Sequence, residues 1–198
     1  MAELTLYYGT METGKTTKLM QDYYNYSKYL LKVFLLKPKI DTKGSKTVIN
    51  RLGQNITCDL LISKSANLLS KKYFNRYKYM QFILVDEAQF LSKKQIMELW
   101  YIAHKFNISV ICYALKSNFR GELFEGSSAL IAISDTKHEL TVNCSCGNAA
   151  VFNARRVNGK YIADGKEIVI DGENKNVEYI PLCSDCYLEF VLHGKMPK

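Results

Sequence analysis

Eight residues near the start of the chain have the types and spacing of a loop that binds phosphate. They match the pattern G-x-x-x-x-G-K-[ST] at every fixed position. An apolar, aromatic stretch at residues 4–8 precedes them and predicts a strand, and apolar residues recur at helical spacing from Leu19 to Leu30. The predicted loop consists of Gly9, Thr10, Met11, Glu12, Thr13, Gly14, Lys15 and Thr16.

A loop between a strand and a helix turns backbone N–H groups and the positive end of the helix dipole toward one point, which suits a phosphate. Lys15 is expected to reach the outer phosphates, and the Thr16 hydroxyl to hold Mg²⁺. The alternative is a glycine-rich turn that matches by chance. The flanking strand and helix favour the phosphate loop, so the sequence predicts that a nucleoside triphosphate binds here.

Two adjacent acids, Asp86 and Glu87, end an apolar stretch that begins at Phe82. An acid at the end of a buried strand, after a phosphate loop, commonly assists the magnesium of the nucleotide, and Asp86 fits this role. Glu87 is then placed to take a proton from the attacking group. Alternatively, one of the two acids caps the next helix. The pair predicts phosphate chemistry on either water, as in a triphosphatase, or a hydroxyl, as in a kinase.

Four cysteines form two close pairs on either side of a long loop: Cys144, Cys146, Cys183 and Cys186. Two pairs of thiolates are the ligand set of a structural, tetrahedral Zn²⁺ site. Disulfides are the competing interpretation, and they are rare in the cytosol. A closed four-coordinate site leaves no open position, so the metal is expected to stabilise the fold and not to act in catalysis.

Strands and helices alternate along the chain up to about residue 135. Continuous apolar strands joined by helices predict a parallel sheet covered on both faces. The fold class expected is therefore α/β, with a RecA-like core at residues 1–135 that binds the nucleotide and a small zinc-ribbon domain at residues 136–198. Beyond the first strand, the sequence predicts strands at 33–36, 60–62, 82–87 and 109–115.

Two helices and one loop complete the predicted core. A helix is expected at residues 65–77, and a capping box of Ser92 and Gln95 opens another that runs through Phe106. A polar loop is expected over residues 41–55.

Composition narrows the class of protein. The chain has 198 residues, of which 47% are apolar, and a formal net charge of +8 that suits an anionic ligand. No apolar run approaches the ~20 residues of a membrane span. No charged and apolar leader precedes the first strand, so the sequence predicts a cytoplasmic protein that does not bind membranes.

Together these motifs resemble the type II thymidine kinases, the tetrameric and zinc-containing family, and in particular its bacterial branch. The segments that carry the resemblance lie in the order and spacing of that family and cover nearly the whole chain. They are the phosphate loop, KPKIDT at 37–42, DEAQF at 86–90, NFRGELF at 118–124 and the two cysteine pairs.

The resemblance implies a kinase that moves the γ-phosphate of ATP to the 5′-hydroxyl of thymidine. It implies that Glu87 accepts the hydroxyl proton, while Asp86 and Gln89 lie on the nucleotide side with Mg²⁺. The resemblance also implies a homotetramer with structural Zn²⁺ and feedback inhibition by dTTP, and no direct contact with nucleic acid. The residues implied to bind the base are Met11, Phe90, Leu115, Phe119, Phe124, Ile170, Gly172 and Tyr179.

Two departures from the family pattern stand out. Lys43 replaces the usual arginine, and the covering segment at residues 172–178 is longer than usual. Two other functions are alternatives to a kinase: a nucleic-acid-dependent ATPase, and a nucleotide sensor that has no catalytic activity. A helicase needs two such cores, and a sensor would give the Glu87 carboxylate no purpose, so the kinase is favoured.

Overall fold

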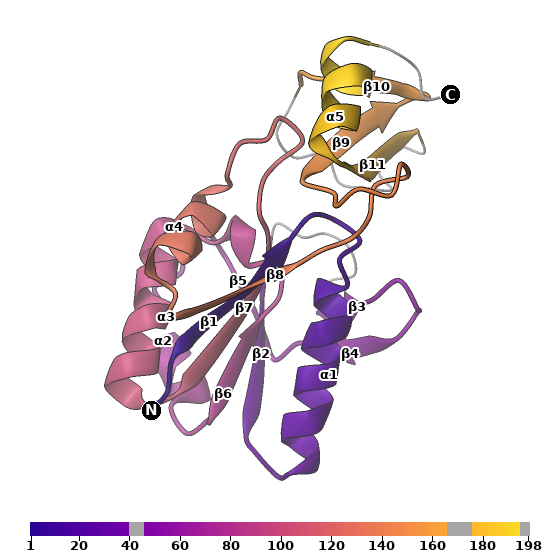
Figure 1. Cartoon of the computed structure of the whole chain (residues 1–198). Coiled ribbons are helices and arrows are strands. Elements are labelled where there is room, and N and C mark those ends of the chain that lie inside the picture. The colour runs from indigo at the N-terminus through magenta and orange to yellow at the C-terminus, as the bar shows by residue number, and fades with distance from the viewer. Residues whose placement is uncertain (40–45, 166–175, 195–198) are drawn as a thin grey trace.

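The structure, a computed structural model, describes residues 1–39, 46–165 and 176–194. Its centre is a parallel sheet of six strands in the order β5-β2-β6-β7-β1-β8. Figure 1 shows α1 on one side of this sheet and α2, α3 and α4 on the other. The predicted α/β class, with a parallel sheet covered on both faces, is confirmed. The strands are β1 (Leu4–Gly9), β2 (Val33–Pro38), β5 (Leu60–Ile62), β6 (Phe82–Val85), β7 (Ser109–Leu115) and β8 (Thr136–Leu140).

Neighbouring residues of each strand point to opposite faces and so join two different cores. On β6, Ile83 and Val85 belong to the core beneath α3 and α4, whereas Leu84 packs with Leu19 of α1. Because both faces of the sheet are buried, the central strands are continuously apolar. This is the feature that made them recognisable in the sequence.

The helices confirm most of the predicted boundaries. They are α1 (Lys15–Lys28), α2 (Lys71–Tyr77), α3 (Lys93–Phe106) and α4 (Glu125–Ile133), with a short 3₁₀ turn, η1 (Ala88–Phe90), after β6. The capping box is present: the Ser92 side chain accepts from the Gln95 N–H, and the Gln95 side chain accepts from the Ser92 N–H.

The prediction of a helix from residue 65 was wrong over its first half, because α2 begins only at Lys71. Side chains of α3 hold the backbone before α2, at residues 63–68, in a non-helical path. The Gln95 amide donates to the carbonyls of Ser63 and Ala66, and Glu98 accepts from the Leu68 N–H at 2.7 Å. Tertiary hydrogen bonds thus replace those that a helix would have formed.

Part of the expected polar loop over 41–55 is an antiparallel hairpin of β3 (Thr47–Ile49) and β4 (Asn55–Thr57). Val48 is fully buried against the α1 side of the core, which explains why the segment is ordered. Lys43 lies outside the described residues.

A second, three-stranded antiparallel sheet has the order β10-β9-β11. It contains β9 (Phe152–Val157), β10 (Lys160–Ile162) and β11 (Val177–Leu182), and α5 (Ser184–Tyr187) and the helical turn η2 (Leu188–Leu192) pack on it. In Figure 1 this unit lies beyond the carboxyl ends of the main strands. None of the helices in the described ranges is long and apolar enough to span a membrane.

The core sheet extends past the boundary predicted at residue 135, because β8 pairs in parallel with β1 from Thr136 to Leu140. The continuous apolar strands do end near residue 135, as the sequence suggested, but β8 is an edge strand with exposed polar residues. It therefore lacks the continuous apolar run of a central strand.

Gly126 lets α4 pack against the turn that follows Glu87. A Cβ at this position would lie 2.5 Å from the Ala88 carbonyl oxygen and 2.8 Å from those of Gln89 and Leu91. Gly126→Ala should therefore destabilise the protein by about 1–3 kcal/mol through overpacking. The gain of about 0.5–1 kcal/mol that alanine usually brings inside a helix is too small to offset this.

Urea unfolding of Gly126→Ala checks the prediction, with Ser128→Ala, an exposed position on the same helix, as the control. A Gly126→Ala protein as stable as the wild type would show that α4 and the turn can separate freely.

Candidate active site

The phosphate loop has the predicted setting, between β1 and the first turn of α1. Gly14 has φ +78° and Glu12 has φ +67°, so the backbone turns through left-handed conformations before the helix begins. Gly9 lies so close to β8 that a Cβ there would come within 2.3 Å of the Leu140 carbonyl oxygen. The loop is thus a tight turn on a buried strand, with N–H groups at the start of α1 available to an anion.

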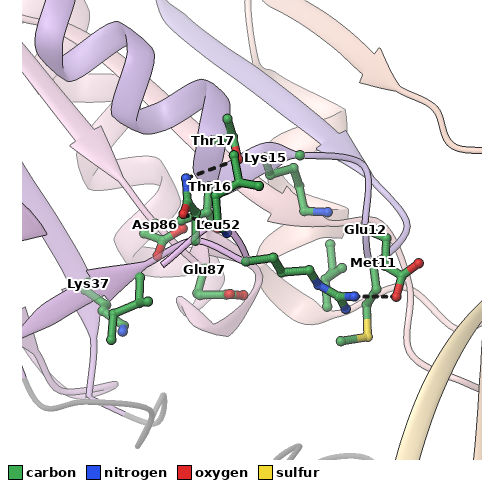
Figure 2. A pocket seen from close by; sticks show the side chains of 14 residues that line it. Met11, Glu12, Lys15, Thr16, Thr17, Lys37, Leu52, Asp86 and Glu87 are labelled. Atoms are coloured by element: carbon green, nitrogen blue, oxygen red, sulfur yellow. Dashed lines mark hydrogen bonds and ion pairs between the residues drawn. The ribbon is translucent and has the colours of Figure 1, made fainter. Parts of the chain in front are cut away.

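A pocket of about 930 Å³ opens beside this loop. Figure 2 shows side chains that line it, drawn from the phosphate loop, the ends of β2 and β6, and the β3–β4 hairpin. The lining includes most of the phosphate loop and both predicted acids. The lining residues are Met11, Glu12, Gly14, Lys15, Thr16, Thr17, Lys37, Ile49, Asn50, Arg51, Leu52, Asp86, Glu87 and Leu115.

Lys15 is held by its own loop. Its ammonium group donates to the Thr10 carbonyl and, at 3.0 Å, to the Thr13 hydroxyl. Burial lowers the pKa of Lys15 to about 8, although the nearby carboxylates of Glu87 and Asp86 act in the opposite direction. A phosphate group entering the pocket would favour the charged amine, so anion binding and protonation of Lys15 are coupled.

Asp86 and Glu87 follow β6 directly and differ in exposure. Asp86 is buried, with 5% of its surface exposed, and its N–H donates to the Leu36 carbonyl. Glu87 is half-buried and has φ +51°, a left-handed conformation that is uncommon outside glycine. The turn at Glu87 sends its carboxylate into the pocket beside Lys15.

Gln89 fixes the carboxylate of Glu87. Its side-chain amide donates to Glu87 Oε2 at 2.5 Å, and its carbonyl oxygen accepts from the Leu115 N–H at 3.0 Å. Gln89 is buried and is not among the described residues that line the pocket. Its predicted contact with the nucleotide stays a prediction, whereas its role in orienting Glu87 became visible only in the structure.

The predicted base-binding aromatics fall into two groups. The rings of Phe90 and Phe124 meet edge to face at 5.7 Å. Phe119 and Tyr179 are joined by Arg155, whose guanidinium lies 3.7 Å from the centre of the Phe119 ring and donates through Nε to the Tyr179 hydroxyl at 2.9 Å. The structure therefore brings together Phe119 and Tyr179, which are 60 residues apart in the sequence. Ile170 and Gly172 lie outside the described residues.

The inward face of β9 carries two functional candidates that were not predicted from the sequence. Asn153 Oδ1 accepts from the Met11 N–H at 2.6 Å, and Asn153 Nδ2 donates to the Ser117 carbonyl at 2.9 Å. Asn153 and Arg155 stand two positions apart, so they share one face of the strand. Both are buried, and two polar residues at this spacing within a strand were the available signal. Through them the small sheet supports the phosphate loop and the aromatic pair.

The four paired cysteines meet at one point, as predicted. Their sulfur atoms all lie within 4.8 Å of one another, and each is a free thiol. Burial opposes ionisation of Cys144, but the N–H groups of Cys146 and Cys183 and the neighbouring thiols together hold its pKa at about 6. Four sulfur atoms this close fit a tetrahedral metal site. Cys58 and Cys112 are buried core residues.

Comparisons with known proteins agree with this site. A family model described as thymidine kinase matches residues 2–187. The thymidine kinase of Shewanella oneidensis is 35% identical over 193 residues, which cover 96% of this chain and 99% of that protein. The thymidine kinase of Rhodopirellula baltica is 38% identical over 186 residues, which cover 92% and 86%. A solved structure of the replication initiator DnaA bound to AMPPCP and single-stranded DNA is 18% identical and covers 71% of this chain and 41% of its own, with a TM-score of 0.45.

The lowered pKa of Lys15 predicts that ATP binding depends on pH. Between about pH 8 and 9.5 the free protein loses the Lys15 proton, which the bound phosphates would retain, so the apparent Kd should rise by up to about tenfold per pH unit. Titration calorimetry at several pH values, in buffers of different ionisation enthalpy, measures both Kd and proton uptake. Lys15→Arg is the control, because arginine stays charged and should remove the pH dependence. A wild-type Kd that is constant over this range would contradict the prediction.

Proposed function

Since this chain belongs to the thymidine kinase family, we propose that it transfers the γ-phosphoryl group of ATP to the 5′-hydroxyl of thymidine in the pocket between the phosphate loop and the end of β6. The observation that carries the proposal is the position of Glu87. Its carboxylate faces the same pocket as Lys15 and is held by Gln89. A triphosphate cradle and a fixed carboxylate are what a hydroxyl-directed phosphoryl transfer requires.

The proposed reaction is a single displacement. The 5′-oxygen forms a bond to the γ-phosphorus while the bond to the β,γ-bridging oxygen breaks, and ADP leaves with that electron pair. Glu87 accepts the proton of the attacking hydroxyl. The loop N–H groups and Lys15 stabilise the negative charge on the phosphates, so the protein contributes mainly position and charge.

Mg²⁺ fits the same pocket. Thr16 at the start of α1 and the buried carboxylate of Asp86 both line it and offer oxygen atoms, the ligands that Mg²⁺ prefers. We assign these two residues to the magnesium that accompanies ATP, where it would neutralise phosphate charge.

Thymidine is proposed to bind at the aromatic groups beside the pocket. Phe119 and Tyr179 would lie along the faces of the base, while Met11 and Leu115 offer apolar contact to its 5-methyl group. Phe90 and Phe124 would close the floor, and the segment containing Ile170 and Gly172 is proposed to read the edge of the base. Met11 and Leu115 line the pocket, and the hydrogen bond of Asn153 to the Met11 N–H supports this placement.

We propose Zn²⁺ as the metal of the four cysteines, and we assign it a structural role. Cys144 and Cys146 lie in a turn before β9 that is closed by the Cys144 N–H on the Asn148 carbonyl, and Cys183 follows β11 and precedes α5. The apolar cluster of this unit is small, so a metal would add the stability that its core lacks.

Assembly, location and regulation are proposed from the family resemblance. The protein would act as a homotetramer in the cytoplasm, supply dTMP for DNA synthesis and be inhibited by dTTP. Two exposed apolar side chains one turn apart on α3, Met97 and Tyr101, support contact with another subunit.

Glu87→Gln tests the proposed base. The substitution keeps the shape of the side chain and removes its capacity to accept a proton, so kcat should fall by about two to four orders of magnitude while ATP binding is retained. Thymidine-dependent release of ADP measures the loss. Glu139→Gln, an exposed acid paired with Lys116, is the matched control. A Glu87→Gln enzyme with more than about a tenth of wild-type kcat would remove Glu87 from this role.

Metal analysis tests the proposed zinc. One Zn²⁺ per chain is expected in the wild type. Cys183→Ser should release it and expose the second sheet to protease while the phosphate-loop core stays folded, whereas Cys58→Ala should keep it. Protein purified under reducing conditions that holds no zinc, or that contains a Cys144–Cys183 disulfide, would overturn the assignment.

A further inference from the structure

Arg51 lies at the tip of the β3–β4 hairpin, in a turn built around Asn50. The Asn50 side-chain oxygen accepts from the N–H groups of Leu52 and Gln54, both at 3.0 Å, and its amide donates to the Gln54 side chain at 2.7 Å. Asn50 is itself buried. The backbone that carries Arg51 is therefore fixed by side-chain hydrogen bonds that close the turn.

The hairpin is anchored to the wall of the phosphate pocket. The buried ammonium of Lys37, at the end of β2, donates to the Thr47 carbonyl at 3.1 Å. The Asn50 amide also reaches the Thr17 hydroxyl at 3.4 Å, in the first turn of α1. These contacts hold the turn beside the helix that begins at Lys15.

The Arg51 side chain points to the phosphate loop. Its Nη1 lies 2.5 Å from Glu12 Oε1, and both side chains line the pocket. The charge of Arg51 also reaches Lys15, whose pKa it helps to lower after the larger effect of burial. A second cation thus faces the place where the outer phosphates of a triphosphate are expected.

The pair with Glu12 is weak enough to be exchanged. The Arg51 side chain is 64% exposed and that of Glu12 37%, and solvent screening makes surface pairs of this kind weak. A phosphoryl group in transfer carries more charge and offers oxygen atoms that match the guanidinium fork.

Other arginines do not compete for this role. Arg120, in the loop after β7, is bound to Glu122 through Nε and Nη2 and to the Gly165 carbonyl through Nη1. Among the described residues that line the pocket, Arg51 is the one arginine.

We infer that Arg51 exchanges Glu12 for the transferring γ-phosphoryl group and stabilises its charge in the transition state, as an arginine finger supplied within the chain. The inference rests on the proposed function, since it needs the ATP and thymidine subsites placed as above. Bond formation at the 5′-oxygen and departure of ADP are unchanged. Arg51 adds two N–H donors to the equatorial oxygens, where charge is concentrated.

A double-mutant cycle separates this role from simple neutralisation of Glu12. Arg51→Ala should lower kcat by about two to three orders of magnitude, the range for one preorganised donor, with the Kd for ATP changed by less than about fivefold. Glu12→Gln is the second single variant of the cycle, and Glu12→Gln/Arg51→Ala should be as slow as Arg51→Ala. Arg156→Ala, which breaks an exposed Arg156–Glu178 pair outside the pocket, is the matched control.

Binding of a transition-state analogue gives a second readout. Affinity for ADP with aluminium fluoride, in the presence of Mg²⁺ and thymidine, should fall in Arg51→Ala by about the same factor as kcat, while affinity for ADP alone should not. Recovery of kcat in the double variant, or equal loss of affinity for both ligands, would overturn the inference. If Glu87→Gln is fully active while Arg51→Ala is slow, the proposed base fails and the role of Arg51 stands.

Discussion

The parallel register of β6, β7 and β1 is the constraint on which the rest of the structure depends. Because all three run in the same direction, their carboxyl ends meet at one edge of the sheet. Gly9 is paired with Leu115, and Val85 with Cys112, so the phosphate loop, the two acids and the loop after β7 all begin there. A change of one residue in this register would exchange the side chains that face the two cores and so disrupt the packing on both sides of the sheet. Burial on both faces therefore fixes the place of the chemistry.

Buried polar side chains then convert this edge into a site with defined geometry. Asn153 accepts from the Met11 N–H and donates to the Ser117 carbonyl, and Gln89 donates to the Glu87 carboxylate and accepts from the Leu115 N–H. Each of these amides uses both a donor and an acceptor, so the cost of burying it is offset by hydrogen bonds. The second sheet is consequently part of the site, since Asn153 and Arg155 come from its central strand.

The charged side chains of the pocket pair with one another in a way that a bound anion would change. Burial disfavours the ammonium of Lys15, while Asp86 and Glu87 favour it. Glu12 places a carboxylate on the phosphate loop, and Arg51 forms an ion pair with it. A bound triphosphate would satisfy both cations at once, which links substrate binding to the organisation of the hairpin and the phosphate loop.

The sequence by itself determined the local features: the phosphate loop, the acid pair after β6, the capping box of α3 and the cysteine pairs. Each depends on a few neighbouring residues, and each central strand is marked by burial on both faces, so periodicity and spacing were sufficient to find them. The resemblance to thymidine kinases built on these motifs is confirmed by the family match.

Only the tertiary structure decided which distant side chains complete the site. The hydrogen bond of Asn153 to Met11 spans 142 positions, and no local pattern encodes such a contact. Local sequence also did not show that β8 belongs to the core sheet, because its residues are exposed and polar. Nor did it show that residues 65–70 are not helical, because their hydrogen bonds are made to Gln95 and Glu98 of a distant helix. The hairpin that carries Arg51 was predicted as a polar loop. One buried valine and the hydrogen bonds of Asn50 stabilise it, and these leave no repeating pattern in the sequence.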